Sequence, residues 1–386
     1  MGLTEEELKE FEDIRPYNDD EYKLVTKRLS NNKYLQSFIR TLRWPNCPKI
    51  LIPPAEILIG QFVRKQIRQN DTIAEFQRDL IINRLVQWVV DKTTDGVSCT
   101  GLDELDMENE SYLFISNHRD IVLDAGFINY FMIKYGYPTT QIAFGDNLLI
   151  NEFVGDLIRI NRSFIVKRDL PPREQIKASI TLSKYINHVI DLGECIWIAQ
   201  KEGRSKDGAD QTNPAVIKMI YLSQRKSELA FSDFINKCRI VPVSISYELD
   251  PCDTLKGWEM YRRETRDVGA KTQTMDLVSM WAGMKGQKGR VNVNFGKPLT
   301  GTFENDKDVA KVLDHEIHRG YKLWPSNYIS FDEINKSEKY KDRYSEEERQ
   351  EFLSRYHKLG EPVMQKVLGA YARPVLNQEE AVFTDD

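Results

Sequence analysis

The sequence lacks the features that define several common protein classes. Its five cysteines are scattered through 386 residues without a C-x-x-C pair, so we expect neither a disulfide framework nor a zinc site. No apolar run approaches the ~18 residues that a membrane-spanning helix needs. The net charge of −5 leaves no excess of Lys and Arg to bind phosphates along a nucleic acid. These absences predict a protein of a reducing compartment with no nucleic-acid partner, no metal and no membrane span.

The N-terminal residues MGLTEEELKEFEDIRPYNDDEYK are acidic and lack the apolar core of a signal peptide. Glu6 stands where an N-myristoylation signal requires Ser or Thr. We therefore expect a cytoplasmic protein that is at most peripheral at the inner face of the cell membrane.

Apolar segments of strand character alternate with amphipathic helical segments through most of the chain, which is the pattern of an α/β fold. We expect a mixed, mostly parallel sheet of about seven strands with flanking helices, preceded by N-terminal helices and followed by a charged C-terminal helical extension. The expected domain ranges are 1–92, 93–300 and 301–386. Strands are predicted at 97–99, 112–115, 142–144, 164–166, 195–199, 240–247 and 290–296. Helices are predicted at 72–90, 125–135, 173–192, 219–234 and from 306 onward, with 250–289 as a polar excursion.

The segment 44–68 allows two interpretations. Its apolar pieces Ile50-Leu51-Ile52 and Ile57-Leu58-Ile59 could pack on the protein's own core, as short apolar runs commonly do. Basic residues flank the segment on both sides, so it could instead lie in a bilayer interface as a peripheral membrane contact. These residues are Arg40, Arg43, Lys49, Arg64, Lys65 and Arg68.

The sharpest polar motif follows the predicted strand 112–115. It reads Phe-Ile-Ser-Asn-His-Arg-Asp-Ile-Val-Leu-Asp, with His118, Asp120 and Asp124, and an apolar helical run begins at Ala125. A histidine at such a strand end lies at the carboxyl edge of a sheet, where open α/β folds bind ligands. A nearby carboxylate can fix its tautomer, and the pair can act as a general base. Alternatively, Asp120 caps the helix and His118 is a hydrogen-bonded turn residue.

Three further apolar segments end in polar groups at the spacing of successive strands. They are Phe164 to Arg168, Trp197 to Ser205 and Ile240 to Tyr247. Four such blocks in this order, spread over roughly 97–298, resemble the glycerolipid acyltransferase superfamily of the glycerol-3-phosphate and 1-acylglycerol-3-phosphate O-acyltransferase type.

The first block of that family is H-x-x-x-x-D, and its histidine removes the proton from an acceptor hydroxyl that attacks an acyl thioester. Asn117-His118 matches the start of this block, but five residues separate His118 from Asp124, and Leu123 stands where the family has its acid. The resemblance therefore implies His118 as the base, with Asp124 as its partner or Asp120 as the alternative.

The other blocks imply substrate-binding residues. The second resembles an apolar segment ending in a basic residue, here Lys167 and Arg168, although Arg162 stands where the family carries glycine. The third resembles Pro-Glu-Gly-x-Arg-Ser in a more compact form, with Lys201 in place of the proline, followed by Glu202, Gly203, Arg204 and Ser205. Arg204 and Lys201 can bind a phosphate, and Gly203 lets the backbone approach it. The fourth is Val241-Pro242-Val243, whose proline predicts an edge strand or a bulge.

The resemblance implies transfer of a fatty acyl chain from acyl-CoA or acyl carrier protein to a hydroxyl of glycerol 3-phosphate or lysophosphatidate in phospholipid biosynthesis. No resident cofactor is implied, because the thioester donor is a co-substrate. One alternative keeps the enzyme but changes the acceptor to another lipid alcohol, such as an acylated amino acid. The other alternative is a non-catalytic lipid-binding protein on the same fold.

Two remaining motifs predict no chemistry. Residues 314–318 hold two histidines at i, i+3 without the H-E-x-x-H spacing of metalloproteases, so we expect a solvated helix face. Residues 283–289 are rich in Gly and Lys but lack the Gly-Lys-Ser/Thr ending of a P-loop, which predicts a flexible basic loop.

Overall fold

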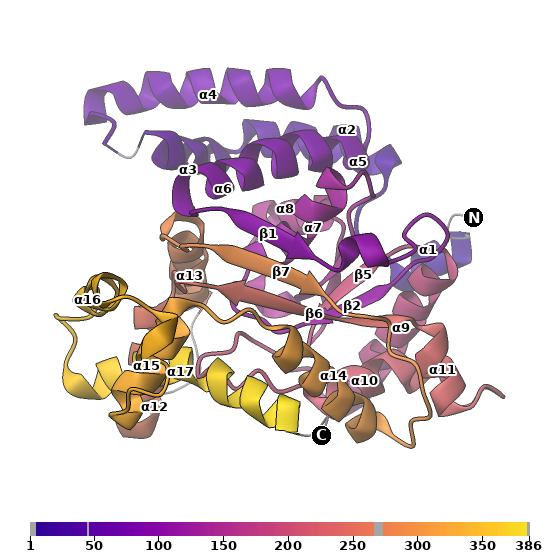
Figure 1. Ribbon diagram of the computed structural model, residues 1–386. Helices are drawn as coiled ribbons and strands as arrows, with labels where there is room; N and C mark the ends of the chain where they lie inside the picture. The colour runs from indigo at the N-terminus through magenta and orange to yellow at the C-terminus, as the bar shows by residue number, and fades with distance from the viewer. Residues whose placement is uncertain (1–4, 45, 266–272, 384–386) are drawn as a thin grey trace.

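The computed structural model describes residues 5–44, 46–265 and 273–383, and its centre is one seven-stranded sheet (Figure 1). The strands are β1 Val97–Thr100, β2 Leu113–Ser116, β3 Gln141–Gly145, β4 Ser163–Val166, β5 Ile196–Ala199, β6 Ile240–Tyr247 and β7 Val291–Phe295. Their order across the sheet is β1-β7-β6-β2-β5-β3-β4. Only the β6–β7 pair is antiparallel. The expected α/β fold with a mixed, mostly parallel sheet is confirmed.

The central strands are apolar on both faces because helices cover both sides of the sheet. In β2, Phe114 packs into one core while Leu113 and Ile115 pack into the opposite core. The Phe114 side is covered by η2 Gln77–Val86, a π-helical stretch, and by α6 Gln87–Thr93 and α7 Leu123–Lys134. The other side is covered by α8 Glu152–Ile160, α9 Pro172–Asp191, α10 Pro214–Tyr221, α11 Phe231–Lys237 and α14 Asp306–Gly320.

The N-terminal helices other than the first form a layer seen at the top of Figure 1, whereas the first packs against α9 of the sheet domain. Their bounds are α1 Glu5–Phe11, α2 Asp19–Asn31, α3 Lys33–Arg43, α4 Ile52–Ile67 and α5 Ile73–Phe76, with a short turn η1 at Lys49–Leu51. Tyr22, Val25 and Leu29 of α2 pack with Ile67 and Phe76 in a small core of their own. We call residues 33–68 the α3–α4 hairpin, and its two helices contact each other along their length.

Only the C-terminal end of α4 enters that core, through Ile67 and Val63, whereas other apolar residues of α4 and Ile50 in the turn η1 do not. Ile50 is 84% exposed, Leu58 64% and Ile57 59%, so these side chains face solvent rather than the protein. No helix in the described part of the chain combines the length and the apolar character that crossing a bilayer requires.

The C-terminal residues fold back against the sheet domain. Helices α15 Pro325–Asn335, α16 Glu346–Ser354 and α17 Glu361–Phe383 share a core around Ile329, Phe352, Tyr356 and Leu368. The last helix, α17, also contacts α14 and α12, which spans Asp253–Thr265.

Three local predictions are wrong. A helix was expected over 219–234, but α10 already begins at Pro214, where Asn213 caps it, and it ends at Tyr221 before α11 starts at Phe231. A polar excursion was expected over 250–289, but this region holds α12 and α13 Gln273–Lys285. Their periodicity is hidden because they bury polar residues such as Lys256 and Asp276, while α13 exposes apolar ones such as Leu277. The expected flexible basic loop at 283–289 is wrong in its extent and exposure, since α13 continues to Lys285 and Lys288, in the remaining loop, is completely buried.

Pro242 lies in neither an edge strand nor a bulge. Its strand β6 sits between β2 and β7, and Pro242 pairs in register with Ile115 of β2. The β6–β7 register begins one residue later, at Val243, and the Pro242 carbonyl accepts the Gly296 N–H at 2.8 Å. The proline therefore stands where the antiparallel ladder ends, so its missing N–H removes no bond of that ladder.

Candidate active site

The predicted site residues follow strands that all end at one edge of the sheet. Strands β2, β5, β3, β4 and β6 are mutually parallel, so their carboxyl ends share that edge. His118 stands two residues beyond β2, and the segment carrying Arg204 follows β5. Below, residues 117–122 are called the His118 turn and residues 200–213 the Arg204 loop.

Asp124 is in direct contact with the His118 imidazole. Its Oδ2 lies 2.8 Å from His118 Nδ1, although six positions separate the two residues. The contact is made because the intervening residues form a turn, and Asp124 occupies the first turn of α7. The backbone N–H groups of Arg119 and Asp120 donate to the same Oδ2, at 2.6 and 2.9 Å. The extra residue relative to the family spacing is therefore absorbed in the turn.

A tyrosine that the sequence analysis did not single out completes the environment of Asp124. The hydroxyl of Tyr247, at the end of β6, donates to Asp124 Oδ1 at 2.8 Å. Burial, together with the neighbouring charges of Asp124 and Asp120, holds the pKa of Tyr247 well above its ordinary value, so the phenol keeps its proton and remains a donor. The buried Asp124 carboxylate thus accepts hydrogen bonds from four donors, which fix its orientation.

His118 itself is only partly covered. Its side chain is 13% exposed and its ring meets the Trp197 ring edge-to-face at 5.8 Å. An ionised Asp124 keeps the proton on Nδ1, so Nε2 is the nitrogen that can accept a proton from a substrate. The pair has the arrangement of a general base with an orienting carboxylate.

Asp120 has a different environment. Its Oδ1 accepts the backbone N–H groups of Val122 and Leu123, both at 2.9 Å, and so caps the start of α7. Its Oδ2 is buried, has no hydrogen-bond partner within the described part of the chain, and faces α13, where a Cβ on Gly283 would lie only 2.1 Å away. Burial and the nearby Asp124 raise the pKa of Asp120 despite the opposing charge of Arg204.

Arg204 is the one residue of the third block whose charge is buried without a full set of partners. Its side chain is 7% exposed, and Nε and Nη1 have no hydrogen-bond partner among the described residues. Such an arrangement is costly unless a ligand completes it, and a planar guanidinium suits a phosphate or carboxylate. The loop is tied directly to the base, because the Ser205 N–H donates to the His118 carbonyl at 2.6 Å. Gly203 adopts φ +72, a left-handed conformation that favours glycine.

The other predicted binding residues form ion pairs on the surface. Arg168 Nη1 lies 2.8 Å from Glu202 Oε1, and the Glu202 side chain is 70% exposed. Lys167 pairs with Asp13 of the N-terminal region at 2.9 Å. Lys201 is half-buried at the start of the loop. Arg168 thus contacts the Arg204 loop through Glu202, whereas Lys167 contacts the N-terminal region.

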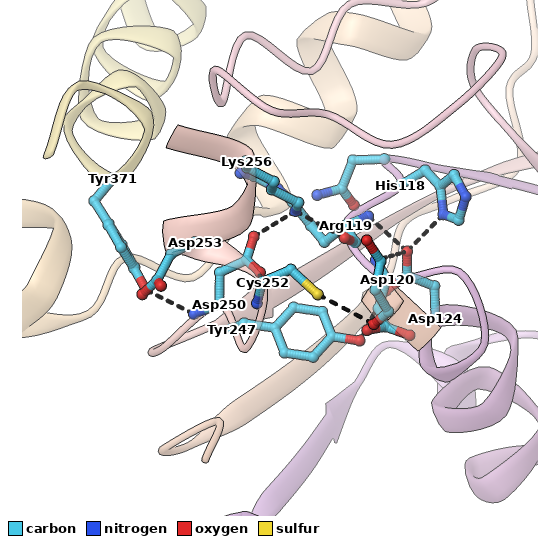
Figure 2. A network of polar contacts seen from close by, with 12 residues as sticks. His118, Arg119, Asp120, Asp124, Tyr247, Asp250, Cys252, Asp253, Lys256 and Tyr371 are labelled. Carbon is cyan, nitrogen blue, oxygen red and sulfur yellow. Dashed lines mark hydrogen bonds and ion pairs between the residues drawn. The ribbon is translucent and has the colours of Figure 1, made fainter. Parts of the chain in front are cut away.

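A buried charged network extends from the His118 turn toward the C-terminal helices (Figure 2). Arg119 pairs with Asp210 and its guanidinium lies 5.5 Å from the centre of the Tyr321 ring. The Lys256 ammonium donates to the Arg119 carbonyl at 2.8 Å and pairs with Asp250. Although burial opposes ionisation of Asp250, Lys256 keeps the pKa of this carboxyl below its usual value. The links of this network to the His118 turn were missed because Asp210 and Lys256 lie 91 and 137 positions from Arg119, which they contact.

Comparisons with known proteins find a family and distant relatives for this chain. A family model described as "Acyltransferase" matches residues 96–246, a range that includes His118, Asp124 and Arg204. Over 245 residues the chain is 23% identical to the glycerol-3-phosphate acyltransferase of Pseudomonas fluorescens, covering 62% of this chain and 27% of that protein. Over 240 residues it is 24% identical to the glycerol-3-phosphate acyltransferase of Pseudomonas syringae pv. tomato, covering 60% and 26%. The chain thus spans about a quarter of the length of the curated relatives it matches. The resemblance expected from the sequence is confirmed.

Proposed function

Residues 96–246 belong to the acyltransferase family, and on that premise we propose that the protein transfers a fatty acyl chain from acyl-CoA or acyl carrier protein to a hydroxyl of glycerol 3-phosphate or lysophosphatidate. The observation that carries the proposal is the 2.8 Å contact between His118 Nδ1 and Asp124 Oδ2, close to a buried Arg204 with unpartnered nitrogens. The first pair supplies a base, and the second feature supplies a receptor for a phosphate.

In the proposed reaction, His118 Nε2 takes the proton of the acceptor hydroxyl while the hydroxyl oxygen attacks the thioester carbonyl carbon. The tetrahedral intermediate collapses with cleavage of the C–S bond, and the leaving thiolate receives the proton from the imidazolium. Asp124 stabilises that imidazolium between the two steps. Helix-end or backbone N–H groups would stabilise the oxyanion, and binding of both substrates next to each other supplies much of the rate.

The phosphate of the acceptor would bind Arg204, with Lys201 and Arg168 at the rim. This assignment accounts for the unpartnered Nε and Nη1 of Arg204, because a phosphate can accept from both at once. It also places the phosphate beside the base, since Ser205 N–H is bonded to the His118 carbonyl. The hydroxyl and the phosphate of one small acceptor could therefore be bound together.

A peripheral membrane contact through the α3–α4 hairpin is part of the proposal. The hairpin exposes Ile50, Ile57 and Leu58 and also Phe62, at 53%. Its sequence holds seven basic residues and only one acidic residue, Glu56, although the whole chain is acidic. Exposed apolar side chains with a basic excess are the combination that binds an anionic bilayer surface. A lipid product or donor would then be exchanged directly with the membrane.

The test is a product assay with purified protein. Acyl-CoA and acyl carrier protein thioesters would each be combined with glycerol 3-phosphate, lysophosphatidate, glycerol and an acylated amino acid, and the lipids formed would be identified by mass spectrometry. We expect acylated products from the phosphorylated acceptors and none with His118→Ala. Products from an unphosphorylated acceptor alone would favour the lipid-alcohol alternative. A folded protein that binds lipid but forms no product would favour the non-catalytic one.

A further inference from the structure

The Arg204 loop is held from outside the family domain, by two helices of the C-terminal region. Three consecutive backbone carbonyls of the loop, those of Gly208, Ala209 and Asp210, face side chains of α14 and α17. Carbonyls in an irregular buried segment need such donors, because no strand or helix satisfies them. The donors lie at least 108 positions further along the chain.

Asn377 of α17 makes two of these contacts. Its Nδ2 donates to the Gly208 carbonyl at 3.0 Å and to the Ala209 carbonyl at 3.2 Å, and the residue is 3% exposed. The amide has a defined orientation because Arg373 Nε donates to its Oδ1 at 2.9 Å. The loop lies directly on α17 here, since a Cβ on Gly208 would come within 2.3 Å of the Ala370 carbonyl.

His318 and Asp314 of α14 hold the next part of the loop. His318 Nε2 lies 3.2 Å from the Ala209 carbonyl and 3.0 Å from the Asp210 carbonyl, so this nitrogen carries the ring proton. Asp314 Oδ1 accepts the Thr212 N–H at 2.6 Å. The expectation of a solvated helix face at 314–318 is therefore wrong, because two of its polar residues bind this loop.

The loop is also fixed to the His118 turn, at both ends of its buried part. Ser205 N–H donates to the His118 carbonyl, and the Asp210 carboxylate pairs with Arg119, the residue after His118. Arg204 directly precedes the first of these two ties, and the 208–210 carbonyls held by α14 and α17 lie between Ser205 and the second. The distance of Arg204 from His118 thus depends on how the 208–210 carbonyls are held.

We propose that Asn377 is a positioning residue for the acceptor phosphate, acting through Gly208 and Ala209 on Arg204. The inference rests on the proposed function, because it assumes that Arg204 binds a phosphorylated acceptor. The acceptor must reach Arg204 with its phosphate and His118 Nε2 with its hydroxyl, so a small displacement of the loop weakens simultaneous binding. A thioester that does not contact Arg204 would not depend on this spacing.

The test uses the full chain with the nearly isosteric change Asn377→Asp. This variant keeps the size of the side chain and its contact with Arg373, but it replaces the donating NH2 with an oxygen that repels the two carbonyls. Gln378→Glu is the matched control. Gln378 Nε2 also donates to backbone carbonyls, at 2.8 Å to Tyr321 and 3.2 Å to Arg319, but it does not touch the loop.

We expect Asn377→Asp to raise the KM for glycerol 3-phosphate about tenfold, the factor that corresponds to loss of one buried hydrogen-bond donor. The KM for the acyl thioester should change less than twofold. Gln378→Glu should leave both values near wild type even if it lowers the melting temperature by a similar amount. An equal rise in both KM values, or the same acceptor effect from Gln378→Glu, would mean that Asn377 only stabilises the fold, and would overturn the proposal.

Binding measured without turnover separates this inference from the function on which it rests. Calorimetric titration of glycerol 3-phosphate into wild type, Arg204→Ala and Asn377→Asp should give binding to the wild type and weaker binding to both variants. No binding and no turnover in the wild type would refute the proposed function and this inference with it. Binding that depends on Arg204 but is unchanged in Asn377→Asp would refute the inference alone. If Asn377→Asp does not fold, His318→Leu tests the same loop, with His318→Gln as the variant that keeps a donor.

Discussion

One carboxylate oxygen of Asp124, Oδ2, accepts hydrogen bonds from His118 Nδ1 and from the backbone N–H groups of Arg119 and Asp120. The turn that spaces the two residues therefore also orients the acid, with no contribution from substrate. This arrangement makes the orientation of the imidazole a property of the backbone, and it separates the roles of the two nearby aspartates.

Asp124→Asn should lower kcat by at least about a hundredfold, because an amide donor facing Nδ1 favours the wrong tautomer of His118. Asp120→Asn should lower it far less, since the amide oxygen can still accept from Val122 and Leu123 at the start of α7. Steady-state kinetics with thermal unfolding of each variant would check this. Small, equal losses from both substitutions would disprove the base–carboxylate pair.

Arg204→Lys should be impaired almost as much as Arg204→Ala when the acceptor carries a phosphate. Lysine keeps the charge but lacks the planar pair of donors that the buried position offers. We expect the acceptor KM to rise and kcat to change less, because the contact exists before and during transfer. The thioester KM is the internal control. An acceptor KM that stays at the wild-type value in Arg204→Ala would show that the phosphate binds elsewhere.

The α3–α4 hairpin should bind anionic vesicles in a salt-dependent manner. Each Lys or Arg near an anionic surface contributes about 1 kcal/mol, and salt screens this attraction. Arg64→Glu/Lys65→Glu should therefore reduce sedimentation with vesicles that contain phosphatidylserine. The control Lys307→Glu/Lys311→Glu makes the same change in charge at exposed positions of α14 and should have little effect. Sedimentation that is unchanged by lipid charge and by the hairpin substitutions would refute a membrane contact through the hairpin.

Lys288 should make the stability of the protein depend on pH above neutrality. Its side chain is completely buried beside Thr93 and Gly286, and burial lowers its pKa to about 8. An unfolded lysine titrates near ~10.4, so between ~10.4 and 8 the unfolded chain binds a proton that the folded chain does not. The free energy of unfolding therefore rises with pH through this window, and the gain is lost as the pH falls toward 8 and the buried lysine takes up its proton.

Urea unfolding of wild type and Lys288→Met from pH 7 to pH 10 would measure that effect. As the pH rises past 8, the free energy of unfolding of the wild type should increase relative to that of the variant. The increase should reach up to about 3 kcal/mol if the Lys288 pKa shifts fully from 10.5 to about 8 on folding. A difference between the two proteins that is constant across this range would show that Lys288 titrates normally.

The strands and the main motif could be read from the sequence because each is a local pattern. A strand buried on both faces appears as a short apolar run, and His118 and Arg204 each follow such a run directly. The partner of His118 remained ambiguous, since the choice between Asp120 and Asp124 depends on how the chain turns between them. Spacing alone does not describe a turn.

The rest of the site depends on contacts between distant segments. Tyr247 reaches Asp124 across 123 positions and Lys256 reaches Arg119 across 137, and neither residue has a local signature. Partly buried polar helix residues such as His318 look like solvated ones in sequence, because a distant loop packs against them. Helices α12 and α13 were missed for a similar reason, as they bury parts of faces that read as polar.

The charge of the α3–α4 hairpin also affects how the whole molecule would approach a surface. Residues 33–68 carry a net charge of +6, and since the complete chain carries −5, the remaining residues together carry −11. The protein is therefore an electric dipole whose positive end is one exposed helical layer. Near an anionic bilayer, the field of the lipid headgroups exerts a torque on this dipole before any side chain touches lipid. The torque acts at separations comparable to the Debye length of about 8 Å. Collisions would thus be biased toward the hairpin, while the acidic remainder would be turned away from the lipid.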